Sequence, residues 1–90
     1  MTLAQTAQHE FNPMLGERLA PAWTALIAHL ADGQPHGRLS CIDAMLAASD
    51  VRRKTCLALI GNGRNAGWLT AEPRTDGLVQ LTARGKGRWL

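Results

Sequence analysis

Hydrophobic residues recur at helical spacing soon after the start of the chain. Five of them fall at i, i+4, i+7, i+8 and i+11, which places them on one stripe of an α-helix: Leu19, Trp23, Leu26, Ile27 and Leu30. Pro21 suits the first turn, where its missing N–H costs nothing. Asp32-Gly33 ends the helix and Pro35 prevents it from resuming. The pattern predicts a helix over residues 20–31 with one buried face.

A shorter apolar pattern follows. Ser40 precedes it and Asp43 lies three residues later, an arrangement that resembles a capping box and predicts a helix over residues 41–48. Before it, Gly37-Arg38-Leu39 is predicted to be a very short extended segment.

Ser49-Asp50 then offers N-cap residues for another helix that begins near Val51. Leu57, Ile60 and Cys56 are assigned to its inner face. Its end lies at Ile60 or as late as Asn65, because Gly61 and Gly63 each cost about 1 kcal/mol inside a helix. Two helices joined by so tight a turn indicate a helix-turn-helix.

From Trp68 onward the hydrophobic period changes to that of strands. Residues 68–71 and 78–82 are short β-prone segments, and residues 72–77 between them form a turn that ends in Asp-Gly. These segments predict a hairpin in which Leu69 and Ala71 face Val79 and Leu81.

The two ends of the chain are less regular. Residues 1–16 predict at best a short, frayed helix and a turn, with Phe11 docking on the domain. Residues 83–90 are basic and close with Trp89-Leu90, an apolar pair that can dock on the core or on a second copy of the chain.

Two segments together resemble a known family. Residues 44–49, followed by 51–60 and Gly67-Trp68-Leu69, look like the helix-turn-helix and strand start of winged-helix regulators. Residues 74–85 look like the wing, whose second strand runs into an L-T-x-x-G pattern, here Leu81 to Gly85. Over residues 20–87 the chain is similar to the DNA-binding domain of MarR-type repressors.

The resemblance implies a fold and a function. The fold is α+β, mainly helical: a winged helix-turn-helix with a three-helix core and a C-terminal β-hairpin wing, formed by residues 17–90 after an extension of residues 1–16. The function is sequence-specific binding of double-stranded DNA by a small transcriptional repressor. MarR-type proteins carry further helices that build a dimer and a ligand pocket, and ninety residues leave no room for these.

The distribution of charge points the same way. The net charge is +3, but residues 1–49 carry two basic and four acidic residues, whereas residues 50–90 carry eight basic and three acidic ones. The halves therefore have net charges of −2 and +5, which favours a polyanionic partner for the second half.

Arg52, Arg53 and Lys54 fall in the predicted first turn of the helix that starts near Val51. Cations there oppose the helix macrodipole at a cost of roughly 0.3–1 kcal/mol each. The cost makes sense if this helix end approaches phosphate or base edges. We assign Arg52 and Arg53 to bases or phosphates, Lys54 and Thr55 to phosphates, and Arg74 to the minor groove. Three tail residues are assigned to flanking phosphates: Arg84, Lys86 and Arg88. Arg64 is left unassigned.

Other chemistry finds little support. Cys41 and Cys56 are expected to be buried hydrophobes, and His29 a partly buried surface residue. A nucleophilic pair of Cys41 with His36 or His29 can be drawn, but such a pair can be drawn in most proteins of this size. A metal site built from His29, His36, Cys41 and Asp43 matches no zinc spacing. We therefore expect no catalytic residue, cofactor, metal or small-molecule ligand. The longest apolar runs have five residues and no secretion signal is evident, so a cytoplasmic protein without a membrane span is expected.

Two functional classes stay open. The first is the DNA-binding repressor, acting as a homodimer if Trp89-Leu90 meets a second copy. The alternative is a winged helix that serves as a protein–protein interaction module or a subunit of a larger assembly, because one fold can serve both purposes.

Overall fold

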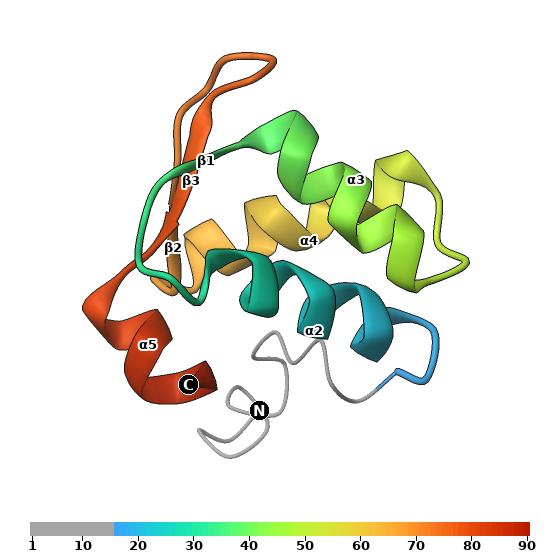
Figure 1. The fold of residues 1–90 in the computed structure, drawn as a ribbon, viewed down its shortest axis with the longest axis horizontal. Helices are drawn as coiled ribbons and strands as arrows, with labels where there is room; N and C mark the ends of the chain where they lie inside the picture. Colours follow the sequence, from blue (N-terminus) through green and yellow to red (C-terminus); the bar gives the residue numbers. More distant parts are fainter. Residues whose placement is uncertain (1–15) are drawn as a thin grey trace, which may run out of the picture.

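The structure, a computed structural model, describes residues 16–90 of the chain. Within them four helices surround one side and one end of a small sheet (Figure 1). In chain order the elements are α2 (Leu19–Leu30), β1 (His36–Gly37), α3 (Arg38–Ala48), α4 (Arg53–Asn65), β2 (Leu69–Ala71), β3 (Leu78–Leu81) and α5 (Ala83–Trp89). The expected class, α+β and mainly helical, is confirmed. The helix and the Phe11 contact predicted for the first residues lie outside the described range.

The sheet is antiparallel and its strand order is β1-β3-β2. The predicted hairpin is confirmed, with Leu69 opposite Leu81 and Ala71 opposite Val79. The extended segment predicted at residues 37–39 forms one position earlier, as the two-residue strand β1, which pairs with β3 through His36 and Val79. β3 is therefore the central strand and ties the hairpin to the start of α3.

The core lies between α2, α3, α4 and the sheet. The predicted stripe of α2 is buried from Trp23 to Leu30, and Leu19 packs against its edge. Both cysteines are buried and free, as expected. Burial raises the pKa of the Cys41 thiol to about 11, so this group is neutral at ordinary pH. The two cysteines therefore act as small core residues.

The start of α3 differs from the prediction. The helix begins at Arg38 rather than at residue 41, and Ser40 lies inside it instead of capping it. The Ser40 Oγ atom is 2.6 Å from His29 Nε2 on α2. The cap comes from the hairpin turn instead: the Leu39 N–H donates to Asp76 Oδ1 at 3.0 Å, and the Arg38 N–H donates to the Gly77 carbonyl. Asp76, which lies 37 positions after Leu39, thus provides the cap expected from Ser40.

α4 runs to Asn65, the later of the two ends considered. It closes with Gly67 at a φ of +83°, where the Gly67 N–H donates to the Arg64 carbonyl and the Trp68 N–H to the Gly63 carbonyl. Gly63 is tolerated within the helix because the side chains of Trp23 and Leu69 occupy the space beside it. A Cβ atom there would lie only 2.8 Å from Trp23 Cη2.

The basic tail, residues 83–90, contains the helix α5, which was not predicted from the sequence. The Thr82 Oγ1 atom accepts from the Gly85 N–H at 3.0 Å and caps α5. A Cβ atom at Gly85 would meet the Trp68 carbonyl oxygen at 2.1 Å, so only glycine fits this contact. Trp89 then packs edge-on against Trp23 and Trp68, with ring centroids 5.3 and 5.0 Å away. The sequence allowed the tail to dock on the core or on a second copy of the chain, and Trp89 docks on the core.

Candidate nucleic-acid interface

The amino-terminal end of α4 is exposed and positively charged. Arg52 is the N-cap residue in an extended conformation without a side-chain cap, and Arg53 and Lys54 are the first two helical residues. All three side chains are exposed, and within residues 16–90 none of them makes an ion pair or a side-chain hydrogen bond. Thr55 is half-buried, and its N–H donates to the Arg52 carbonyl at 2.9 Å.

The N-cap residues predicted for this helix are used elsewhere. The Ser49 hydroxyl donates to the Met45 carbonyl at 2.6 Å and so closes α3. The Asp50 carboxylate lies 3.9 Å from Arg18 Nε, a highly exposed pair on the α2 side. Because no acidic or hydroxyl side chain caps α4, the backbone N–H groups of Arg53 and Lys54 lack a partner within the described residues. Free donors, helix dipole and three cations all add positive potential at one place.

Leu57 of α4 is exposed, although the sequence pattern predicted it on the inner face of the helix. Its side chain is 42% exposed, whereas Leu59, which was not assigned to the core, is 3% exposed. The buried set of α4 is Cys56, Leu59, Ile60 and Gly63, at i, i+3, i+4 and i+7. Arg53, Leu57 and Arg64, at i, i+4 and i+11, follow a flank of the helix next to the buried stripe. Of the three residues predicted for the inner face, Cys56 and Ile60 are confirmed and Leu57 is wrong.

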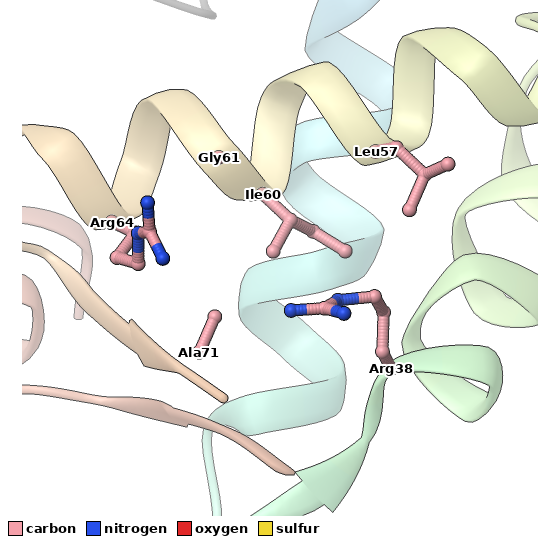
Figure 2. Close-up of a pocket in the computed structure, with 6 residues that line it drawn as sticks. All are labelled: Arg38, Leu57, Ile60, Gly61, Arg64 and Ala71. Atoms are coloured by element: carbon pink, nitrogen blue, oxygen red, sulfur yellow. The ribbon is translucent and has the colours of Figure 1, made fainter. Parts of the chain in front are cut away.

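A hollow of about 210 Å³ lies beside the flank of α4 that carries Leu57 and Arg64 (Figure 2). Leu57, Ile60 and Gly61 from α4 form one wall, and Ala71 at the end of β2 forms another. The guanidinium groups of Arg38 and Arg64 extend into the space from α3 and α4. Arg64, which the sequence left unassigned, and Arg38, which it overlooked, therefore line one hollow beside α4, with Arg64 coming from the last turn of that helix. Only the fold brings Arg38, in the acidic half of the chain, to this place.

Arg38 also holds the hairpin turn in position. Its Nη1 and Nη2 groups donate to the backbone carbonyls of Arg74 and Glu72. A guanidinium has five N–H donors, so these two bonds leave others for a ligand. Together with the Asp76 cap, they join the turn of residues 72–77 to the first turn of α3.

Arg74 lies in the turn as predicted, but its guanidinium is paired with Glu72 Oε1 at 2.9 Å. The N–H of Leu78, and secondarily Arg74, lowers the pKa of the Glu72 carboxyl. The Arg74 side chain is 70% exposed, and an exposed ion pair contributes only about 0–1 kcal/mol. A phosphate group can therefore compete for this arginine.

The basic residues of α5 lie away from the end of α4 that carries Arg52. Figure 1 shows α5 beyond the ends of β2 and β3 that are opposite the turn, near the carboxyl end of α4. The 13-residue length of α4, roughly 20 Å, separates that end from its basic first turn. Arg84, Lys86 and Arg88 are exposed, and the Arg88 guanidinium lies 4.1 Å from the centroid of the Trp89 ring. The structure thus divides the predicted site residues into two groups.

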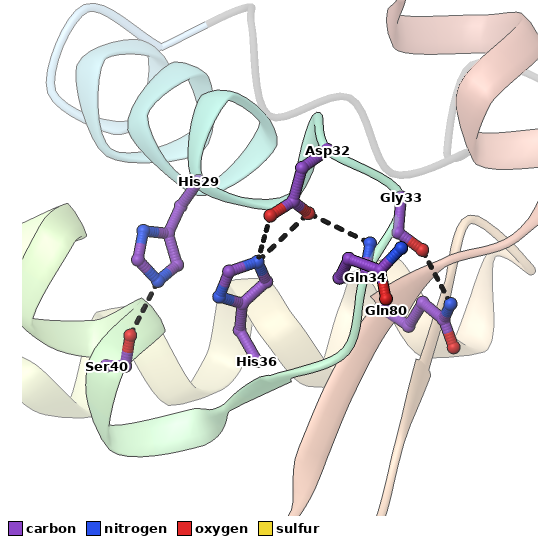
Figure 3. A network of polar contacts seen from close by, with 7 residues as sticks. All are labelled: His29, Asp32, Gly33, Gln34, His36, Ser40 and Gln80. Carbon is purple, nitrogen blue, oxygen red and sulfur yellow. Dashed lines mark hydrogen bonds and ion pairs between the residues drawn. The ribbon is translucent and has the colours of Figure 1, made fainter.

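His29 and His36 lie in a separate group of polar contacts at the α2–β1 turn (Figure 3). His36 Nε2 lies 2.9 Å from Asp32 Oδ2, and the Gln34 N–H donates to Asp32 Oδ1. That backbone bond, followed by the His36 contact, lowers the pKa of Asp32. Within residues 16–90 no three histidine, cysteine or acidic side chains lie close enough to hold a metal ion. The contacts of Asp32 with Gln34 and His36 join the two sides of the α2–β1 turn.

Among the described helices, none combines the length and hydropathy needed to cross a bilayer. Comparisons of the chain with family models, curated proteins and solved structures found no match.

Proposed function

We propose that residues 17–90 form a winged helix-turn-helix and that this domain binds double-stranded DNA in a sequence-specific manner. The order of elements supports the fold: a first helix, a short strand, two helices joined by a tight turn, and a hairpin packed beside them. In this proposal α3 and α4 are the helix-turn-helix, α4 is the recognition helix and residues 72–77 are the tip of the wing. The family proposed is that of the MarR-type regulators, and the role is that of a small transcriptional repressor.

The observation that carries the proposal is the amino-terminal end of α4. Three exposed cations share it, and no acidic residue lies in its first turn. This arrangement costs stability in the free protein but favours a polyanion. Recognition helices contact base edges with their first residues, and arginine can form a bidentate contact with guanine. We therefore assign Arg52 and Arg53 to bases or phosphates, and Lys54 and Thr55 to phosphates.

We propose two further residues for the interface and give three others a secondary role. Arg38 and Arg64 are proposed phosphate contacts because they flank the hollow beside α4. The residues of α5 are proposed to reach only DNA that extends past the carboxyl end of α4.

A protein–protein interaction module is the second candidate, and one observation favours it. A hollow of about 130 Å³ lies between α2 and α5, lined by Trp23, Thr24, Ile27 and Trp89. None of the residues proposed to contact DNA lines it. The proposed homodimer would use this region or the exposed Leu90, and light scattering of the full chain tests it.

The salt dependence of binding separates the two candidates. A fluorescein-labelled pool of random duplexes is titrated with the protein at several salt concentrations, and Kd is measured by anisotropy. With about four to six phosphate contacts, log K falls against log salt with a slope of about −4 to −5. Feeble binding with a flat salt response would contradict DNA binding and favour the interaction module.

Two matched double variants locate the interface. Arg52→Ala with Arg53→Ala should weaken binding at least tenfold and slightly raise the midpoint of thermal unfolding, because the clash with the helix dipole is relieved. Arg84→Ala with Arg88→Ala removes the same charge from α5 and should weaken binding to a short duplex much less. Equal losses in both variants would show a diffuse electrostatic attraction in place of a site on α4.

A further inference from the structure

Leu57 occupies an unusual place for a large apolar side chain. Within residues 16–90 three large hydrophobic residues are exposed: Leu57 at 42%, Leu78 at 44% and Leu90 at 64%. Leu90 is the last residue and Leu78 belongs to β3, whereas Leu57 lies in the second turn of α4, on the exposed flank beside the hollow. One turn before it stands Arg53, and two turns after it stands Arg64. An apolar group thus interrupts a basic surface.

The surroundings of Leu57 leave room for a ligand. Gly61, one turn further on, has nothing within 4 Å of its Cβ position, so the helix surface is recessed there. Ile60 and Ala71 extend the apolar wall into the hollow of about 210 Å³ (Figure 2). Arg38 and Arg64 are the polar groups of this hollow. The space accepts a flat or rounded apolar group whose neighbours are anionic.

In a DNA major groove one such group exists. Thymine presents its C5-methyl group there, whereas the other bases present only hydrogen-bond donors and acceptors. A leucine has neither donor nor acceptor, so it gains free energy from thymine and leaves the polar edges of other bases unpaired. The phosphates on either side of that base are the natural partners of the flanking arginines.

We propose that Leu57 is a specificity-determining residue that contacts the C5-methyl group of a thymine beside α4. This inference rests on the proposed function and names the base that the middle of α4 selects. The position that Leu57 contacts is then a T·A pair, within about one helical turn of the bases contacted by Arg52 and Arg53.

Deoxyuridine tests the contact because it differs from thymidine in DNA only by that methyl group. Duplexes that bind the protein are first selected from a random library. Each thymine of a selected duplex is then replaced singly by uracil, and Kd is measured by anisotropy for the full chain. The wild-type protein should bind about fourfold more weakly at one position per site, as the loss of one buried methyl contact predicts.

The variants assign that effect to Leu57. Leu57→Ala should bind the thymine and uracil duplexes equally at the sensitive position. Leu78→Ala, which shortens a leucine of similar exposure on β3, should retain the fourfold difference. Leu57→Gln should shift the preference at that position toward adenine, because glutamine forms a bidentate contact with adenine. This gain of a new preference does not depend on a loss of folding.

Two results would overturn the inference in distinguishable ways. Salt-dependent binding in which no uracil substitution matters, or in which Leu57→Ala keeps the wild-type uracil effect, would remove Leu57 from base recognition and leave the proposed function intact. Absence of salt-dependent binding to any duplex would refute both.

Discussion

Replacing Asp76 by alanine tests a contact between the hairpin turn and the start of α3, which are far apart in the sequence. Asp76 lies in the turn between β2 and β3, yet its Oδ1 atom accepts the N–H of Leu39 in the first turn of α3. No side chain of α3 itself caps this end. The substitution therefore removes both a hydrogen bond and a negative charge from a helix amino terminus.

The magnitude follows from these two losses. Removal of a capping acceptor costs about 1 kcal/mol, within a range of about 0.5–2 kcal/mol. Loss of a carboxylate at the positive end of the helix dipole adds about 0.3–1 kcal/mol in the same direction. We expect the free energy of unfolding to fall by about 1–2 kcal/mol. For a domain of this size each kcal/mol lowers Tm by about 4–8 °C.

Urea denaturation of the full chain, followed by far-UV circular dichroism, measures this change. Asp43→Ala is the matched control, because Asp43 is an exposed aspartate of α3 with no hydrogen bond to another described residue. Asp76→Asn keeps an acceptor oxygen and should recover part of the loss. If Asp76→Ala unfolds at the same urea concentration as Asp43→Ala, the turn does not cap α3 and the reasoning is wrong.

Two further predictions concern packing. Gly61→Ala should raise the free energy of unfolding by about 0.5–1 kcal/mol, since its Cβ position is open, whereas Gly63→Ala should lower it by about 1–3 kcal/mol because its Cβ position overlaps core side chains. Urea titrations of both variants check this, and equal signs for the two would contradict it. Trp89→Ala should lower the free energy of unfolding by about 3 kcal/mol and weaken the near-UV circular dichroism of the indole cluster. An unchanged near-UV spectrum would show that α5 does not pack on the core.

Local patterns in the sequence predicted the elements that depend on local spacing. The stripe of α2 is visible in the sequence because its five apolar residues occupy one face without interruption. The hairpin register follows from alternation, which brings Ala71 opposite Val79. The end of α4 was uncertain because Gly61 and Gly63 look equally unfavourable in a sequence. In the structure Gly63 is required by Trp23, and Gly61 faces open space.

The errors arose where a partner distant in sequence decides the local structure. Ser40 has the features of an N-cap residue, but the Asp76 carboxylate accepts the Leu39 N–H and caps α3 instead. No local pattern in the sequence predicts this contact. α5 contains two glycines and has a low helix propensity. Its backbone nevertheless packs closely against the Trp68 carbonyl at Gly85, and this tertiary contact favours the helix. In the candidate site, the cations of α4 were predicted from their charge and from their place in the first turn of a predicted helix. Arg38 was missed because its role depends on the three-dimensional position of the turn.

The way in which Arg38 holds the turn has a consequence for sequence change. Its guanidinium bonds to main-chain oxygens of residues 72 and 74, which every amino acid possesses. Residues 73, 74 and 75 can therefore be exchanged without losing this anchor, provided that Asp76 and the tightly packed Gly77 are retained. Substitutions at these three positions of the hairpin turn can therefore change what the turn contacts, while its backbone stays attached to α3.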